Sequence, residues 1–399
     1  MSARPIAPSP ALARLIDEGY EVEVRAAHLL VHSVPYVTAA RVVQRGTLVC
    51  TYIESGGVLQ PPDNHQVWFT GEYPCLASGA RLSALENEHN RQALFDGCTI
   101  QHRFSNKPEG LSNFVDHYQK MVHYVTILSD QARVLDPSAD ARTGRIVIAA
   151  PDDSVHRYAD TASARAEILG LAPRLRQKVA IVGLGGTGAY VLDQLTKTHA
   201  AEIHLFDGDL FLQHNAFRAP GAATFEELKA GLSKVAYFQA RYVHMHRHIH
   251  AHEYFIDEGN VSELGAFDFV FVCVDRGAAR RLICDFLMAA GIPFIDVGMS
   301  IEIVPESQTL VGTCRTTLVT PTTREHVSQF VPLSDDDSNP LYRSNIQVAD
   351  LNALNAMLAV IKWKQLFGFY HDDFGSHHVT YSISSQSLTR DVMTKAVVA

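Results

Sequence analysis

Long apolar runs, an excess of basic residues and closely spaced cysteines are all missing from this sequence of 399 residues. A helix that spans a bilayer needs roughly 18 apolar residues in a row. The most apolar long segment, residues 351–370, is interrupted by Asn355, Lys362 and Lys364. The formal net charge is −9, whereas nucleic-acid binding requires clustered Lys and Arg. We therefore expect no contact with a membrane and none with nucleic acid.

The cysteines are few and scattered. None of the six belongs to a Cys-x-x-Cys pair, which is the usual source of a structural zinc site. Isolated thiols are typical of proteins in a reducing compartment. The first 19 residues also lack the continuous apolar core of a secretory signal. We therefore expect a cytoplasmic protein, in which Cys75 and Cys98 are buried structural residues rather than nucleophiles.

The chain is long enough for two domains, and its pattern changes near residue 145. The turn-forming stretch LDPSADARTG, residues 135–144, separates the two parts. Residues 1–145 combine β-branched and aromatic strand patterns with one amphipathic helix, which predicts a small α+β accessory domain. We expect its strands at 28–37, 46–59 and 65–75 and its helix at 111–132.

Residues 146–399 alternate strand and helix patterns, which predicts βαβ units and an α/β fold with a mostly parallel sheet. We expect strands at 178–184, 202–209, 249–256, 267–275 and 293–301, with two more inside 309–321. We expect helices at 187–200, 224–246, 279–291 and 344–370.

A glycine-rich loop follows the first of these strands. It reads Gly183-x-Gly185-Gly186-x-Gly188 and leads into an amphipathic helix. Glycines allow a tight turn and a close approach of the backbone to phosphate, and the helix N-terminus attracts anions. Asp207 ends the next strand, where a carboxylate can bind a ribose hydroxyl. These features fit NAD and ATP equally well.

The polar residues that follow favour ATP. Asp209, Asn215, Arg218 and Lys234 come soon after Asp207 in the chain. Arg and Lys stabilise charge that develops on phosphates, and carboxylates bind Mg²⁺. A further carboxylate, Asp275, closes a buried apolar strand, at the edge where parallel sheets bind their ligands. A hydride-transfer site has little use for this set, so the pattern favours nucleotidyl transfer.

The motifs GLGGTG, DGDLFLQHNAFR, LSK and CVD, in this order, resemble those of the ThiF/MoeB superfamily, the adenylyltransferases related to ubiquitin-activating enzymes. The resemblance covers roughly residues 150–399 and implies a Rossmann-like adenylation domain at 146–399. It also implies an ATP- and Mg²⁺-dependent reaction. The C-terminal carboxylate of a ubiquitin-like or sulfur-carrier protein would attack the α-phosphate of ATP and release pyrophosphate. The activity would be the activating step of a bacterial conjugation or sulfur-transfer pathway, in a homodimer, with a downstream transfer enzyme as a further partner.

The resemblance implies a role for each matching residue. Four glycines would line the phosphate loop: Gly183, Gly185, Gly186 and Gly188. Asp207 would bind the ribose. The triphosphate would be surrounded by Asp209, Asn215, Arg218 and Lys234. Asp275 would bind Mg²⁺ and, with Arg218 and Lys234, form the catalytic set. Arg157, or less favourably Arg165, would reach the site of the other subunit.

The sequence departs from the family in the region where a thioester would form. Conjugating members carry an acceptor cysteine in a crossover loop, expected here at 320–343, and that stretch has none. Cys314 lies just before it. Three outcomes stay open: the reaction stops at the adenylate, a partner supplies the nucleophile, or a hydroxyl such as Ser334 or Ser338 accepts the acyl group. Ala219 stands where many members have Gln after the Arg.

Other functions compete with this interpretation. An NAD-dependent oxidoreductase would leave Arg218, Lys234 and Asp275 unexplained. A catalytically silent nucleotide-binding adaptor would keep the fold as a platform for partners. A cyclising relative that acts on a modified tRNA base is disfavoured by the acidic balance. The run HMHRHIHAH straddles a predicted helix end and strand start, so we expect its histidines, from His244 to His252, on a solvated or hydrogen-bonded surface rather than at a metal.

Overall fold

The computed structural model describes residues 9–147, 154–334 and 346–391. The chain forms two compact units. Unit 1 comprises residues up to 154 together with 158–172, and unit 2 comprises residues 155–157 and those from 173 onward. Within the described ranges, no helix is both long and apolar enough to cross a membrane.

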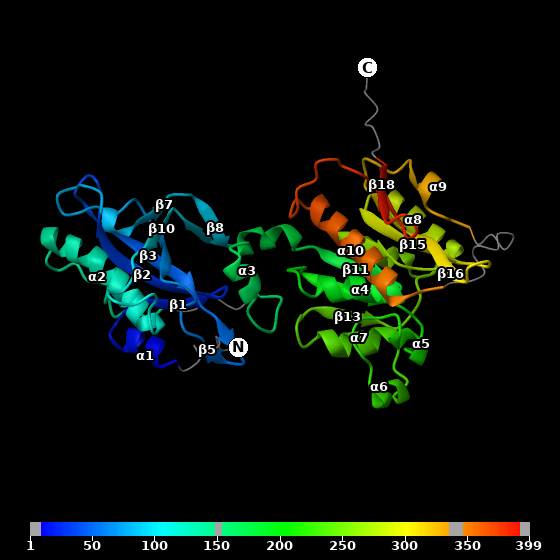
Figure 1. Cartoon of the computed structure of the whole chain (residues 1–399), viewed down its shortest axis with the longest axis horizontal. Coiled ribbons are helices and arrows are strands. Elements are labelled where there is room, and N and C mark those ends of the chain that lie inside the picture. The colour runs from blue at the N-terminus through cyan, green and yellow to red at the C-terminus, as the bar shows by residue number, and fades with distance from the viewer. Residues whose placement is uncertain (1–8, 148–153, 335–345, 392–399) are drawn as a thin grey trace, which may run out of the picture. The chain divides into compact units, whose positions relative to one another are not determined.

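Unit 1 is built on an antiparallel sheet with the strand order β1-β2-β3-β6-β10-β7. The long helix α2 (His117–Leu135) lies across β2 and β3 (Figure 1). Its N-terminus is capped by Asp116, whose carboxylate accepts a hydrogen bond from the backbone N–H of Gln119 at 2.7 Å. Met121 and Tyr124 on its inner face are fully buried against the sheet. The expected α+β domain is therefore confirmed.

The strands of this sheet are β1 (Val22–Arg25), β2 (His28–Val37), β3 (Val43–Thr51), β6 (Gln66–Thr70), β7 (Glu86–Glu88) and β10 (His102–Ser105). The shorter elements before unit 2 are α1 (Pro10–Asp17), β4 (Glu54–Ser55), β5 (Val58–Leu59), η1 (Ser83–Leu85), β8 (Gln92–Phe95), β9 (Cys98–Ile100), α3 (Thr161–Arg165) and η2 (Leu169–Leu175).

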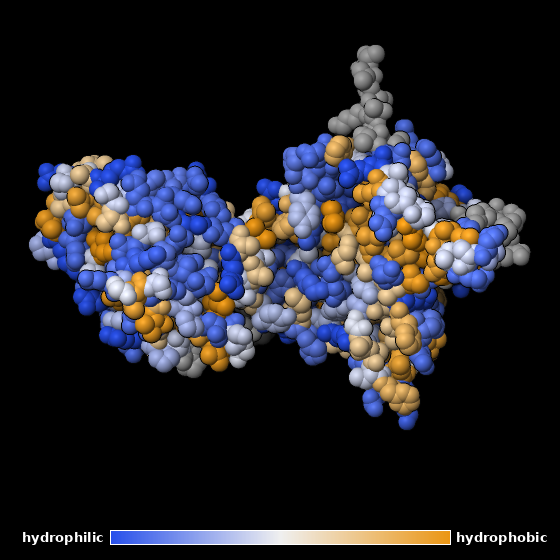
Figure 2. Space-filling model, in the orientation of Figure 1, coloured by the Kyte–Doolittle hydropathy of each residue, from blue (hydrophilic) through white to orange (hydrophobic). Residues whose placement is uncertain are grey.

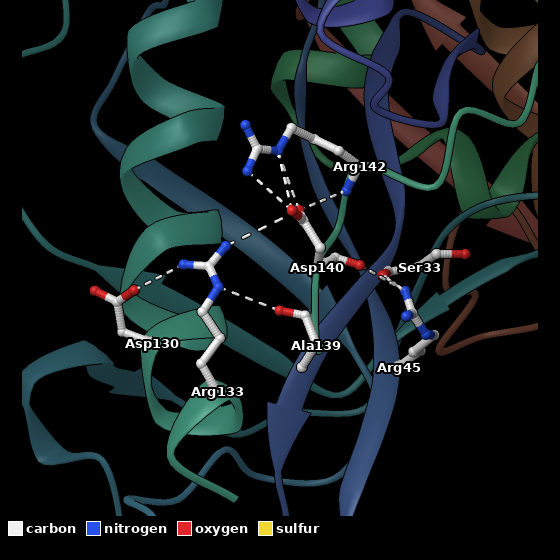
Figure 3. Close-up of polar contacts among 7 residues, drawn as sticks. All are labelled: Ser33, Arg45, Asp130, Arg133, Ala139, Asp140 and Arg142. Carbon is white, nitrogen blue, oxygen red and sulfur yellow. Dashed lines mark hydrogen bonds and ion pairs between the residues drawn. The ribbon is translucent and has the colours of Figure 1, made fainter. Parts of the chain in front are cut away.

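The turn-rich stretch 135–144 is fixed to unit 1 by a group of charged side chains (Figure 3). Arg45 donates hydrogen bonds to the carbonyl oxygens of Ser33 and Asp140, at 2.7 and 3.0 Å. The Asp140 carboxylate accepts from Arg142 at 2.9 Å and lies 3.9 Å from Arg133 of α2. The hydrogen bond from Arg142 is the largest cause that lowers the pKa of Asp140. These contacts give the stretch a defined conformation on the surface of the sheet.

Unit 2 contains an eight-stranded sheet with the order β13-β12-β11-β14-β15-β16-β17-β18. The strands from β13 to β15 in this order are parallel, and the pairs from β15 to β18 are antiparallel. This arrangement confirms the expected α/β fold with a largely parallel sheet. Its strands are β11 (Lys178–Val182), β12 (Glu202–Phe206), β13 (Ile249–His252), β14 (Phe269–Val272), β15 (Phe294–Val304), β16 (Thr309–Val319), β17 (His378–Ser382) and β18 (Ser387–Asp391).

Helices cover both faces of this sheet because its inner strands are apolar on both sides. On β11, Val179 and Ile181 face one core cluster, while Ala180 and Val182 face another. Helices α4, α7 and α10 pack on the first face, and Figure 1 shows α10 in orange beside α4. Helix α8 and η3 pack on the second. The helical elements of unit 2 are α4 (Gly186–Leu195), α5 (Gln213–Ala216), α6 (Phe225–Lys229), α7 (Lys234–Tyr242), η3 (Val261–Ala266), α8 (Gly277–Ala290), α9 (Val327–Phe330) and α10 (Ala349–Leu366).

Three local predictions for unit 2 were wrong. The single helix expected at 224–246 is divided into α6 and α7 by Gly231, whose φ of +63° cannot continue a right-handed helix. The two strands expected inside 309–321 are one strand, β16, which pairs with β15 along its whole length. The pair β17 and β18 was not expected, although it extends the sheet beyond β16.

We predict that acid weakens unit 2 through His246. Its buried ring contacts the carbonyl oxygen of Ala200 at 3.0 Å through Nε2 and accepts from the backbone N–H of His248 through Nδ1, so it fits as a neutral ring. Burial lowers its pKa to about 4. The unfolded chain, with a pKa of about 6.5, binds the proton first, so this stability is present above pH 6.5 and is lost as pH falls toward 4. The expected loss is on the order of 2–3 kcal/mol.

Urea unfolding of unit 2 measures this effect through Trp363 fluorescence in a Trp68→Phe background, because those are the two tryptophans of the chain. His246→Gln keeps a donor for the Ala200 carbonyl oxygen and should flatten the pH dependence. An equal slope in the two proteins would contradict the assignment to His246.

Candidate functional site

The residues predicted to bind a nucleotide follow three adjacent strands at one edge of the sheet. Val182, the last residue of β11, is paired with Phe206 of β12 and with Val272 of β14. Gly183 and Asp207 follow the first two strands directly, and Asp275 comes three residues after β14 ends. The Asp275 side chain is exposed. The sequence-predicted positions therefore emerge from neighbouring strands at the carboxyl edge, where parallel sheets bind ligands.

Each glycine of the loop meets a different steric limit. Gly183 has a φ of +93°, and a Cβ there would lie 2.7 Å from the carbonyl oxygen of Cys273, at the exit of β14. At Gly188 a Cβ would lie 1.9 Å from the carbonyl oxygen of Gly183, and at Gly186 it would overlap the side chain of Asn352. A Cβ at Gly185 would meet nothing within 4 Å. Three glycines are thus required by packing, whereas Gly185 borders open space.

We predict that Gly188→Ala damages the fold and that Gly185→Ala leaves it intact. The methyl group at position 188 would overlap a backbone carbonyl that belongs to the same loop, and this overpacking should cost about 2–3 kcal/mol. At position 185 the backbone is extended, with φ −69° and ψ −153°, and a Cβ meets no atom within 4 Å, so we expect alanine to fit there. Chemical unfolding of both variants measures the difference. Equal stability of the two would show that the loop relaxes without cost.

Lys234, Asp207 and Asp209 form a buried ion-pair group beside the loop. The Lys234 ammonium lies 3.3 Å from both Asp207 carboxylate oxygens and 2.6 Å from an oxygen of Asp209. The Asp207 carboxylate also accepts hydrogen bonds from the backbone N–H groups of Leu184 and Asp209, at 2.7 and 2.9 Å. Asp207 and Lys234 are buried, while the Asp209 side chain is 57% exposed. Asp207 therefore ties the glycine loop to the end of β12 and to the start of α7.

Asn215 and Arg218 lie in and after the short helix α5. Asn215 is buried, and its side-chain oxygen accepts a hydrogen bond from the backbone N–H of Leu212 at 2.8 Å. Its backbone carbonyl accepts from the N–H of Arg218 at 3.1 Å. Among the described residues, nothing accepts a hydrogen bond from the buried Nε of Arg218. A nitrogen of this kind can donate a hydrogen bond to an oxygen of a bound ligand.

The ThiF family matches residues 163–381, which is more than half of the chain. The chain belongs to the ThiF family. Residues 10–161 match a second family, which is described as a domain of unknown function, DUF6791. No curated protein sequence matches the chain.

Among solved structures, the chain is similar to MccB of E. coli and to PaaA. The microcin C7 biosynthetic enzyme MccB in complex with N-formylated MccA is 17% identical, with a TM-score of 0.46 over 60% of this chain and 72% of that one. MccB of E. coli with ATP is 15% identical, with a TM-score of 0.44 over 59% and 73%. PaaA is 18% identical, with a TM-score of 0.43 over 55% and 74%.

The structure also describes other residues that were considered in the sequence. Arg157 belongs to unit 2, where its Nε donates to the carbonyl oxygen of Val243 at 3.0 Å, and Arg165 ends α3 in unit 1. Cys314 is buried in β16, and burial raises the pKa of its thiol to about 11. Ser334 is exposed, and Ser338 lies outside the described residues. Cys75 and Cys98 are buried, as expected.

Sequence reasoning missed a buried charged group behind the ThiF site. Asp296 of β15 is fully buried and lies 3.0 Å from Arg280 of α8 and 2.7 Å from Arg315 of β16. Arg280 also donates hydrogen bonds to the carbonyl oxygens of Val274 and Pro332. It thereby connects the loop of Asp275 to the segment before residue 334. The aspartate inside the apolar strand PFIDVGM could have indicated this group, because a buried carboxylate requires a charged or hydrogen-bonding partner.

Apolar side chains are exposed on the segment between Asp209 and Lys234. Figure 2 shows hydrophobic surface around the part of unit 2 that carries α6. The exposed large apolar residues of this segment are Leu210, Leu212, Phe217, Phe225 and Leu232. The segment between Asp209 and Lys234 thus exposes five large apolar side chains.

Proposed function

We propose that this ThiF-family chain adenylates the C-terminal carboxylate of a small ubiquitin-like or sulfur-carrier protein, with ATP as the second substrate and pyrophosphate as a product. The observation that carries the proposal is the ion-pair group of Lys234, Asp207 and Asp209 next to the glycine loop. A lysine at this place would stabilise the charge that develops on the phosphates when the carboxylate attacks the α-phosphate. In a hydride-transfer reaction no charge develops on the phosphates, so Lys234 would have no comparable role.

Two further observations fit ATP at this edge. Gly185 borders open space at the N-terminus of α4, where unpaired N–H groups and the helix dipole attract phosphate. The buried Nε of Arg218 has no hydrogen-bond acceptor among the described residues, and a phosphate oxygen would supply one. Asn215 fixes the turn from which Arg218 emerges. Asp207 would combine its loop-fixing contacts with ribose binding.

Asp275 would hold Mg²⁺, and the bound ion would neutralise negative charge on the phosphates. Its carboxylate is exposed at the carboxyl edge of the sheet, which is where a hard oxygen donor is required. Other residues of the chain would shape the phosphate loop and bind the phosphate oxygens. Gly183, Gly186 and Gly188 would set the loop, and Lys234 would bind phosphate oxygens in exchange for its contact with Asp209.

Gly185→Ala should separate binding from folding. The added methyl group would occupy the open space before α4, so we expect the Kd for ATP to rise at least about tenfold while stability is retained. Isothermal titration of ATP and Mg²⁺ into wild type and variant measures the change. An unchanged Kd would mean that the phosphates do not approach position 185.

The exposed apolar segment supports a protein partner close to the site. Leu212 and Phe217 flank the α5 turn that leads to Arg218, so a second copy of the chain or the carrier would contact residues next to the phosphates. We propose that the chain forms a homodimer and that unit 1 recognises the carrier or a downstream transfer enzyme.

We propose that no thioester forms on Cys314, because this cysteine is buried. Its Sγ contacts the carbonyl oxygen of Leu351 and has no exposed surface. Ser334 is an exposed hydroxyl within the described part of the crossover segment. Mass spectrometry after turnover tests it: a hydroxylamine-labile adduct on Ser334 would support an oxyester, and its absence would leave the adenylate or a partner nucleophile.

ATP–pyrophosphate exchange tests the proposed function. Purified chain is incubated with Mg²⁺ and the ubiquitin-like proteins encoded by neighbouring genes, each in full length and without its last two residues. Exchange that depends on the intact carrier C-terminus would support acyl-adenylation. Absence of exchange together with tight NAD binding would favour an oxidoreductase instead.

A further inference from the structure

One face of β12 and β13 carries imidazoles where the neighbouring strand β11 carries Ala180 and Val182. Glu202, His204 and Phe206 alternate along β12, and His204 is paired with His250 of the edge strand β13. The next pair on the same face of the sheet is Phe206 with His252. The rings of His204 and His250 are stacked with centroids 4.4 Å apart. This group has no part in the proposed nucleotide site.

The contacts of this group favour one arrangement of its protons. The Glu263 carboxylate accepts from the Tyr254 hydroxyl at 2.7 Å, so the single hydroxyl proton points to Glu263. His252 then donates to the Tyr254 oxygen through Nδ1, at 3.2 Å, and its Nε2 is left as an acceptor. His204 lies 2.9 Å from that nitrogen and donates to it through Nδ1. A neutral His204 is thereby left with a lone pair on Nε2.

That lone pair faces a carboxylate. Nε2 of His204 lies 2.9 Å from Oε2 of Glu202, and the same oxygen lies 3.1 Å from the Lys178 ammonium. With its proton on Nδ1, His204 offers the Nε2 lone pair to a metal ion. An ion bound by Nε2 and Oε2 would replace Lys178 as the positive partner of Glu202. One ligand atom from each of Glu202, His204 and His250 lies within 4.8 Å of the other two. A tetrahedral ion with bonds of about 2.0–2.1 Å separates its ligands by roughly 3.3 Å, so small side-chain rotations close the site.

We propose that Glu202, His204 and His250 form a binding site for a divalent transition metal such as Zn²⁺. Two imidazoles and one carboxylate are a donor set that zinc accepts, with a fourth position left for water. His252 acts as the outer partner, because a metal-binding histidine donates its other ring N–H to a fixed acceptor. The ion would join the edge strand β13 to β12, the strand that directly precedes Asp207.

Zinc titration against a competing chelator, with the full-length chain, tests the proposal. We expect one tightly bound Zn²⁺ that is lost or weakened at least about tenfold in His250→Ala and in Glu202→Gln. His250 is exposed and Gln is isosteric with Glu, so both variants should fold. His244→Ala is the matched control, because His244 is an exposed histidine of the same run outside the cluster. Cobalt substitution should give the visible spectrum of a tetrahedral site in wild type and in the control.

We expect weaker zinc binding in His250→Ala and Glu202→Gln, and zinc binding equal to that of wild type in His244→Ala. The proposal would be overturned by wild type that binds no zinc, or by zinc binding that His250→Ala and Glu202→Gln leave unchanged. Equal weakening in the His244→Ala control would also overturn it, because the histidine run as a whole would then be responsible.

Discussion

Asp275→Asn is expected to lower carrier-dependent ATP–pyrophosphate exchange on the order of 100-fold or more while leaving the fold intact. Asparagine keeps the size of the side chain but removes the charge that would hold Mg²⁺. The side chain at position 275 is exposed, so the substitution should not disturb the core of unit 2. Exchange rates at saturating ATP, together with thermal melting of both proteins, separate lost chemistry from lost structure.

Asp285→Asn is the matched control, because Asp285 is an exposed aspartate on α8, the helix that follows Asp275. It should retain wild-type exchange. Full activity of Asp275→Asn would remove this residue from the site and, with it, the proposed Mg²⁺ position.

Asp296→Asn is expected to cost about 3–5 kcal/mol of unfolding free energy in unit 2. The carboxylate is fully buried between Arg280 and Arg315, so its neutral replacement leaves two buried guanidinium groups without their counter-ion. Exchange activity should fall as well, because Arg280 fixes the carbonyl oxygen of Val274, next to Asp275. Urea unfolding followed by Trp363 fluorescence measures the stability.

A second change separates charge from packing in this group. Arg315→Met in the Asp296→Asn background removes one of the two unpaired charges and keeps an unbranched side chain, so it should recover part of the lost stability. A further loss instead would show that Arg315 stabilises β16 through packing and through its hydrogen bond to Thr317.

The strands and the loop around the site could be predicted because their patterns are local. An apolar strand, a glycine-rich turn and an amphipathic helix are encoded within residues 178–195, and β11 and α4 lie there. Asp207 could be placed for the same reason, since it directly follows β12. The position of Asp275 is less regular than expected, because β14 stops at Val272 and the chain turns before α8.

Contacts that depend on strand register could not be predicted. His204 meets His250 because β12 and β13 are parallel neighbours, and nothing within the run HMHRHIHAH points to residue 204. The histidine run was expected on a solvated or hydrogen-bonded surface. This was wrong for His246, which is buried and contacts the Ala200 carbonyl oxygen. Asp296 and Arg315 meet only because β15 and β16 form a long antiparallel hairpin. In both cases the sequence shows the residue types but not their partners.

The intact mass of the carrier tests the central claim most directly. A ubiquitin-like protein from a neighbouring gene is incubated with the chain, ATP and Mg²⁺, and the mixture is denatured and weighed at once. The account predicts that the carrier gains the mass of one adenylyl group, and that the gain disappears with Asp275→Asn or with a carrier that lacks its last two residues. A carrier that stays unmodified while the chain cleaves ATP or binds NAD would contradict it.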